Sequence, residues 1–154
     1  NQLTAKEVVQ MRQSMEKVGI PAKAAAQRTL LKELEAHFRE KNTPAATARL
    51  NEYRKTGEMQ FLDYSYLVRY FNEKATDNTY VPSLLTWSTD ALKLVKPAQK
   101  NKKEVADLYL EQAKAYQRIG KKIEATKSAQ EALSIAKAAQ IDTQAYTQML
   151  SKIK

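Results

Sequence analysis

The stretch from residue 106 to residue 139 constrains the fold of this chain more than any other. It predicts two amphipathic helices that meet at a single glycine, Gly120. Glycine adopts the left-handed conformation that ends a helix without a side-chain penalty, so we expect the chain to reverse direction there. The two facing sides alternate small and large side chains, at Tyr109, Ala113, Tyr116, Ala125, Ala129, Ala132 and Leu133. The small residues let the two backbones approach closely, and the rings fill the gaps between them.

These residues resemble a tetratricopeptide repeat, whose unit is a helix–turn–helix of about 34 residues. The positions that match its pattern are Tyr109, Ala113, Tyr116, Gly120, Glu124-Ala125 and Ala132-Leu133. The chain departs from the pattern at Gln112, Ala129 and Lys137, where the repeat usually has a leucine, a large aromatic residue and a proline. The resemblance implies an interaction scaffold of stacked helix pairs. An ordinary antiparallel helix pair with small residues at its seam is the alternative.

Composition extends the helical prediction to the whole chain. Only three glycines and four prolines occur in 154 residues, and runs of β-branched residues are absent. We therefore expect an all-α fold of about eight helices in a single domain. Residues 1–57 are expected to form the N-terminal helices, and residues 60–154 to form helix pairs closed by a C-terminal capping helix. The repeat resemblance implies that these antiparallel pairs stack as a short right-handed superhelix.

Local signals place the N-terminal helices. Thr4 and Glu7 form a capping-box pattern before a first helix, whose predicted apolar stripe is Val8, Met11, Met15 and Val18. Thr43-Pro44 predicts the start of the third helix, because threonine can cap a helix and proline suits its first position. The predicted inward residues of that helix are Ala45, Ala48 and Tyr53, and Gly57 is expected to close it.

The helix predicted over residues 60–74 is the most apolar. One of its faces carries Tyr64, Leu67, Val68 and Phe71, and another carries Tyr66 and Tyr70. A helix that is apolar on several sides is usually central in its domain, so we favour core packing over a ligand-stacking role for these tyrosines. In the next helix, Trp87 is expected to anchor the packing between neighbouring helix pairs. There Ala91-Leu92 echoes Ala132-Leu133, which indicates an earlier, degenerate copy of the repeat.

A wider resemblance covers residues 61–154, which look like the helical tails attached to thioredoxin-fold proteins of Bacteroides-type bacteria. The matching elements are Tyr66-Leu67, Asp77, Trp87, Ala91-Leu92, Gly120, Glu124-Ala125, Asp142-Thr143, Met149-Leu150 and Lys152-Ile153. This resemblance implies an accessory region beside a redox domain, exported to the periplasm; a cytoplasmic location is the alternative. Because the chain starts at Asn1 without a methionine or a signal-like segment, we expect a processed or excised piece.

The repeat pattern predicts which residues face a partner. On the first helix of the central unit these are Asp107, Leu110, Lys114 and Gln117. In a solenoid such positions line a concave groove, and this mixed polar set suits an extended peptide or a neighbouring domain of the same parent chain. The alternative is a groove that the chain's own helices fill.

Catalysis, cofactor binding and metal binding have no support in the sequence. The chain has no cysteine and one histidine, His37, for which we predict a structural role. Nucleophile elbows, zinc-protease motifs and phosphate-binding loops are all absent. The acidic residues are scattered over helix faces close to lysines and arginines, as in ordinary surface pairs. We therefore expect no catalytic, cofactor-binding or metal-binding residues.

The net charge of +9 leaves a second hypothesis open. A basic cluster could bind an anionic surface, nucleic acid or lipid, through Lys93, Lys96, Lys100, Lys102 and Lys103. A solvated loop over residues 97–103 is the favoured interpretation, with Asn101 and Glu104 forming a second capping box. Nucleic acid is the less favoured partner, because lysines and glutamates are interleaved along the helices. No apolar run approaches the roughly 20 residues that span a bilayer.

Overall fold

The computed structural model describes residues 2–153. Within this range the chain forms eight α-helices, one short 3-10 helix and no strand, which confirms the prediction of an all-α fold with about eight helices. The elements are α1 (Ala5–Lys17), α2 (Ala22–Arg39), α3 (Thr43–Arg54), α4 (Phe61–Lys74), α5 (Val81–Lys93), η1 (Pro97–Gln99), α6 (Lys103–Arg118), α7 (Lys122–Ala138) and α8 (Gln144–Lys152).

The chain forms two compact units. Unit 1 contains α1, α2 and α3 up to Met59, together with the connection Ala75–Tyr80. Unit 2 contains Gln60–Lys74 and the chain from Val81 onward, and so holds α4 to α8. The first boundary lies just beyond Gly57, which follows the end of α3 at Arg54 by three residues. Each unit buries its own cluster of apolar side chains.

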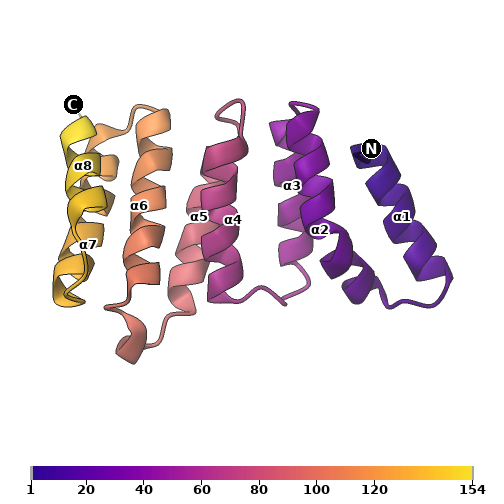
Figure 1. Cartoon of the computed structure of the whole chain (residues 1–154), viewed down its shortest axis with the longest axis horizontal. Helices are drawn as coiled ribbons and strands as arrows, with labels where there is room; N and C mark the ends of the chain where they lie inside the picture. Colours follow the sequence, from indigo (N-terminus) through magenta and orange to yellow (C-terminus); the bar gives the residue numbers. More distant parts are fainter. Residues whose placement is uncertain (1, 154) are drawn as a thin grey trace. The chain divides into compact units, whose positions relative to one another are not determined.

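In unit 1, α2 packs against both α1 and α3 (Figure 1). The predicted capping box is confirmed: the Glu7 amide donates to the Thr4 hydroxyl at 3.1 Å, and the Thr4 amide donates to the Glu7 carboxylate at 3.0 Å. Val8 is buried together with Ala36 of α2. Val18, predicted to belong to the same stripe, is 80% exposed, because α1 ends at Lys17 and leaves Val18 in the C-cap.

The start of α3 differs by one residue from the sequence prediction. Asn42, and not Thr43, is the N-cap: its side-chain oxygen accepts a hydrogen bond from the Ala45 amide at 3.1 Å. The buried stripe of α3 follows the spacing i, i+4, i+7, and Ala48 therefore faces solvent. The residues of this stripe are Ala46, Leu50 and Tyr53.

In unit 2, the predicted reversal at Gly120 is confirmed. Gly120 has φ +74°, and its amide donates to the Gln117 carbonyl at 3.0 Å. The next amide, that of Lys121, donates to the Tyr116 carbonyl at 3.0 Å. These two hydrogen bonds satisfy carbonyls that the end of α6 leaves free, and they fix the turn. As a result, α6 and α7 run side by side in opposite directions (Figure 1).

Alanines form the seam between α6 and α7. Ala113, Ala125, Ala129 and Ala132 are all fully buried, as the sequence predicts. The larger side chains at the same pair of helices, those of Tyr109, Tyr116 and Leu133, are half-buried. Because these alanines leave little space between two closely spaced backbones, the seam tolerates added volume poorly.

We expect Ala129→Leu to destabilise unit 2 by about 1–3 kcal/mol, because its extra methylenes must be forced into a closely packed seam. The matched control is Ala138→Leu near the exposed end of the same helix, for which we expect a change within about 0.5 kcal/mol. Urea unfolding followed by circular dichroism measures both variants. Equal stabilities of the two variants would contradict a tight seam.

The pair α4 and α5 contributes the aromatic core of unit 2. Tyr64, Leu67, Val68 and Phe71 are buried as predicted. Trp87 of α5 is fully buried, and its ring meets the edge of Phe71 at a centroid distance of 4.8 Å and an interplanar angle of 73°. The two tyrosines of the second face differ in exposure. Tyr70 is buried, whereas Tyr66 is exposed and stacks on Tyr70 at a ring-centroid distance of 6.0 Å.

The connection between α5 and α6 contains the short 3-10 helix η1. The predicted capping box at Asn101 and Glu104 is wrong. Lys102 occupies the N-cap position of α6 and provides no side-chain cap, so Asn101 lies one residue too early to reach the free amides. Beyond this connection, α6 packs against α7 and also contacts α4, α5 and α8. It is therefore the central helix of unit 2.

Candidate functional site

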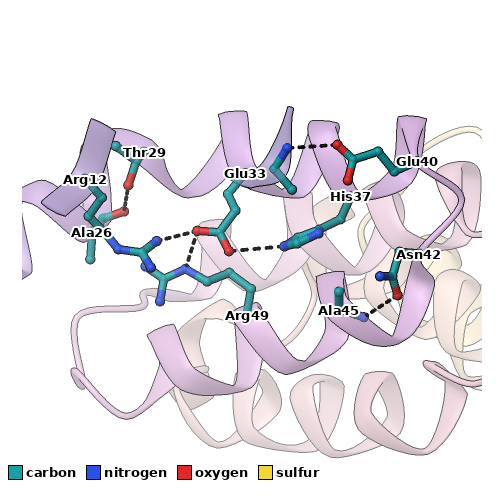
Figure 2. A network of polar contacts seen from close by, with 10 residues as sticks. Arg12, Ala26, Thr29, Glu33, His37, Glu40, Asn42, Ala45 and Arg49 are labelled. Carbon is teal, nitrogen blue, oxygen red and sulfur yellow. Dashed lines mark hydrogen bonds and ion pairs between the residues drawn. The ribbon is translucent and has the colours of Figure 1, made fainter. Parts of the chain in front are cut away.

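Unit 1 contains a buried cluster of charged side chains drawn from α1, α2 and α3 (Figure 2). Its centre is Glu33 of α2, whose side chain is 5% exposed. One carboxylate oxygen accepts a hydrogen bond from Arg12 of α1 and lies 3.1 Å from Nε of Arg49 of α3. The other oxygen lies 3.1 Å from Nε2 of His37, one turn further along α2. One carboxylate therefore links all three helices of the unit.

The arrangement around Glu33 is suited to holding the fold together. Both of its oxygens are occupied by protein groups, so neither is presented to a substrate. Burial lowers the pKa of Arg49, and the nearby charge of Arg12 lowers it further, whereas Glu33 raises it. His37, for which we predict a structural role, is partly buried and contacts Glu33 through Nε2. Among residues 2–153, no group of three or more histidine, cysteine, aspartate and glutamate side chains could hold a metal ion.

The predicted partner-facing residues lie in unit 2, on α6, and the structure separates them into different environments. Asp107 is engaged on both oxygens: one accepts the Tyr146 hydroxyl of α8 at 2.6 Å, and the other pairs with Lys103 at 2.6 Å. Burial raises the pKa of Tyr146, and its hydrogen bond to Asp107 raises it further. Leu110 is buried in the core cluster that α6 shares with α7 and α8.

The other two predicted residues lie closer to the C-terminal end of α6. Lys114 is exposed and pairs with Glu111 one turn earlier, at 2.9 Å. The Gln117 side chain donates to the Lys152 carbonyl of α8 at 3.1 Å. Through Asp107 and Gln117, α6 therefore binds α8 at both ends. The chain's own last helix takes up part of the surface that the sequence assigned to a partner.

A cleft of about 380 Å³ remains open between α4 and α6. Two of the predicted residues, Asp107 and Leu110, line it. The α4 wall supplies an exposed tyrosine, Tyr66, with the guanidinium of Arg69 5.9 Å from its ring centroid. The remaining lining residues are Leu62, Ser65, Glu104 and Glu111. The cleft, which we call the α4–α6 groove, thus has an aromatic and cationic wall opposite a wall rich in carboxylates.

A second cleft, of about 460 Å³, lies where α4 and α6 begin and α5 ends. Its apolar lining comes from Phe61, Leu62, Leu94, Val95 and Val105, and its polar lining from Lys96, Gln99, Lys102 and Glu104. We call it the basal cleft. Leu62 and Glu104 line both clefts, so the basal cleft adjoins the α4–α6 groove.

Of the four residues predicted to face a partner on α6, Asp107 and Leu110 line this groove, whereas Lys114 and Gln117 do not. The repeat pattern predicts partner-facing residues only on the central unit, and the tyrosines of α4 are predicted to pack in the core, so the α4 wall is not predicted. The helical spacing of Leu62, Ser65, Tyr66 and Arg69, which puts all four on one face, was the available signal. Their proximity to α6 depends on tertiary packing, which this spacing does not specify.

Comparison of this chain with models of protein families, with curated proteins and with solved structures found no match. Within residues 2–153, none of the helices combines the length and the apolar character that crossing a membrane requires.

Proposed function

We propose that this protein is a non-catalytic, helical-repeat interaction module that binds an extended peptide or a neighbouring domain along α4 and α6. The observation that carries the proposal is the α4–α6 groove, which two helices line with apolar, aromatic and charged side chains. Tyrosine and arginine are the residue types enriched among the strongest contacts of protein interfaces. In this groove Tyr66 and Arg69 are both exposed and adjacent.

The proposal includes a tetratricopeptide-like architecture for unit 2. In this interpretation α6 and α7 are the best-preserved repeat, α4 and α5 an earlier copy, and α8 the terminal cap. The contacts of α6 with both α4 and α8 support it, because the first helices of successive pairs are neighbours in a repeat array and line its concave side. The right-handed superhelix is part of the same proposal.

We further propose that the module is an accessory region of a larger, exported thioredoxin-like protein. The residues that resemble such tails support this, among them Trp87, which is buried, and Gly120, which forms the turn. The test is the coding sequence on either side of this chain. A thioredoxin-like domain with an export signal supports the proposal, and an unrelated neighbouring domain contradicts it.

Selection of peptides from a random displayed library tests the binding function directly. We expect selected peptides to bind the full chain and to lose at least about tenfold in affinity when Arg69→Glu or Tyr66→Ala alters the groove, a typical effect for central interface residues. Both residues are exposed, so the substitutions leave the core intact. Fluorescence anisotropy with a labelled peptide measures the affinity.

The matched control is Lys127→Glu on α7, which changes the net charge as much as Arg69→Glu but lies outside the groove. We expect it to leave binding unchanged. If Arg69→Glu and Lys127→Glu weaken binding equally, the effect is one of net charge alone. In that case, or if the groove variants bind as tightly as the wild type, the groove is not the binding site.

A further inference from the structure

The basal cleft combines an apolar interior with a cationic rim. Its apolar lining includes two of the most exposed large side chains of unit 2, those of Leu62 (66% exposed) and Leu94 (47% exposed). Its volume of about 460 Å³ falls within the roughly 300–1,000 Å³ of typical ligand pockets. Exposed apolar side chains gathered in a recess are a recurring sign of an interaction site.

The lysines at this cleft are not neutralised by the protein. Two other lysines of the same region have internal partners: Lys93 pairs with Asp90 at 3.7 Å, and Lys103 pairs with Asp107 at 2.6 Å. By contrast, Lys96 and Lys102, which line the cleft, make no ion pair with any residue in the described range 2–153. Lys100, in the same connection, is also exposed and unpaired there. Glu104 is the single carboxylate of the lining.

We propose that the basal cleft binds an acidic peptide segment by taking up one large apolar side chain between these lysines. The apolar side chain, aromatic or aliphatic, contacts Phe61, Leu94 and Val95. In the peptide, the carboxylates that flank this side chain form ion pairs with Lys96 and Lys102. Lys100 lies within the same positively charged region. Burial of the apolar side chain supplies most of the affinity. The charges determine the specificity for the partner and raise the association rate.

The shape of the site favours a peptide over an anionic membrane. A bilayer surface is bound by apolar side chains that protrude from one helix face, with lysines beside them. Here the apolar side chains come from α4, α5 and α6 and line a recess, which a single side chain can fill and a flat surface cannot. The site also lacks an exposed aromatic ring for base stacking, which single-stranded nucleic acid uses, because Phe61 is half-buried.

This inference rests on the proposed function, since the basal cleft adjoins the α4–α6 groove and specifies the chemistry of what binds at its end. The probe is a short labelled peptide with a Phe-Leu pair between glutamates and aspartates. Two companion peptides replace either the Phe-Leu pair with alanines or the acidic residues with serines. Binding to the full chain is measured by fluorescence anisotropy at two salt concentrations.

We expect the complete probe to bind most tightly and each companion to bind at least about tenfold more weakly. We also expect a loss of at least about tenfold for Lys96→Glu combined with Lys102→Glu, and a similar loss for Leu94→Ser. The matched control, Lys122→Glu combined with Lys127→Glu on α7, makes the same change in net charge and leaves binding unchanged. All five positions are exposed, so we expect each variant to fold as the wild type does.

Three results overturn the inference. If the peptide without its Phe-Leu pair binds as well as the complete probe, the lysines bind any polyanion. If vesicles containing phosphatidylserine bind the chain and displace the probe through these same lysines, the site is a membrane contact. If Arg69→Glu abolishes binding while the cleft variants do not weaken it, the groove functions and the cleft is not part of it. That last outcome leaves the proposed function intact. If instead the groove variants alone fail to weaken binding, the proposed function is contradicted.

Discussion

Glu33→Gln should destabilise unit 1 by about 3–5 kcal/mol, the largest effect that we expect from a single charge-neutralising substitution in this protein. The glutamine keeps the shape of the side chain but removes its negative charge. Arg12 and Arg49 then lose their shared counter-charge, and His37 loses its carboxylate partner, although all three side chains remain at least four-fifths buried. Leaving charges buried without a partner is much more costly than losing an exposed ion pair.

The matched control is Glu35→Gln on the same helix, because Glu35 is exposed and the chemical change is identical. We expect it to change stability by no more than about 0.5 kcal/mol. Amide hydrogen exchange along α2 measures the opening free energy of unit 1 for both variants. Equal protection in the two variants would show that Glu33 does not hold the three helices together.

A second set of variants separates charge from packing at the same cluster. Replacing Glu33, Arg12 and Arg49 together with leucine or methionine removes the charges and keeps apolar contact between the helices. Such replacements of buried ion clusters are often neutral or stabilising, so we expect the triple variant to be more stable than Glu33→Gln alone. If the triple variant is the less stable of the two, then packing specific to the cluster dominates.

Trp87→Ala should destabilise unit 2 by about 3–5 kcal/mol, as truncation of a large buried aromatic residue usually does. Trp87 is fully buried, and its edge-to-face contact with Phe71 adds about 0.5–1.5 kcal/mol beyond simple burial. Because it is the only tryptophan of the chain, its loss also removes the fluorescence signal. Urea unfolding is therefore followed by circular dichroism.

Two further variants define what the result for Trp87 means. Trp87→Phe keeps a ring in place and should lose clearly less stability than Trp87→Ala. Leu94→Ala, a truncation of a half-exposed side chain after the same helix, should lose no more than about 1 kcal/mol. A Trp87→Ala variant as stable as Leu94→Ala would mean that the ring contributes little to the core of unit 2.

Most of the helices could be predicted from the sequence because their signals are local. The capping box at Thr4 and Glu7 lies within one turn, and the turn at Gly120 depends on one residue that tolerates positive φ. Two other helix ends could not be predicted from a glycine. Lys41 and Gln140 adopt φ of 55° and 57° at the ends of α2 and α7 without being glycines. There the hydrogen bonds that close the helix outweigh the side-chain penalty, and no glycine marks the position in the sequence.

The candidate sites were less predictable, for a physical reason. Helical spacing predicts that Asp107, Leu110, Lys114 and Gln117 share a face of α6, but only Asp107 and Leu110 line the α4–α6 groove. It could not show that Asp107 and Gln117 bind α8, or that Tyr66 and Arg69 of α4 form the opposite wall. Those contacts join residues far apart in the chain.

The sequence by itself determined that the chain is helical, which faces of most of its helices are apolar, and that it reverses at Gly120. Only the tertiary structure decided which charges meet at Glu33, which lysines stay unpaired, and where apolar side chains enclose a recess. The first set depends on backbone geometry and neighbours within a turn. The tertiary contacts depend on how whole helices pack. That packing is the sum of many weak contacts, and no single sequence motif specifies it.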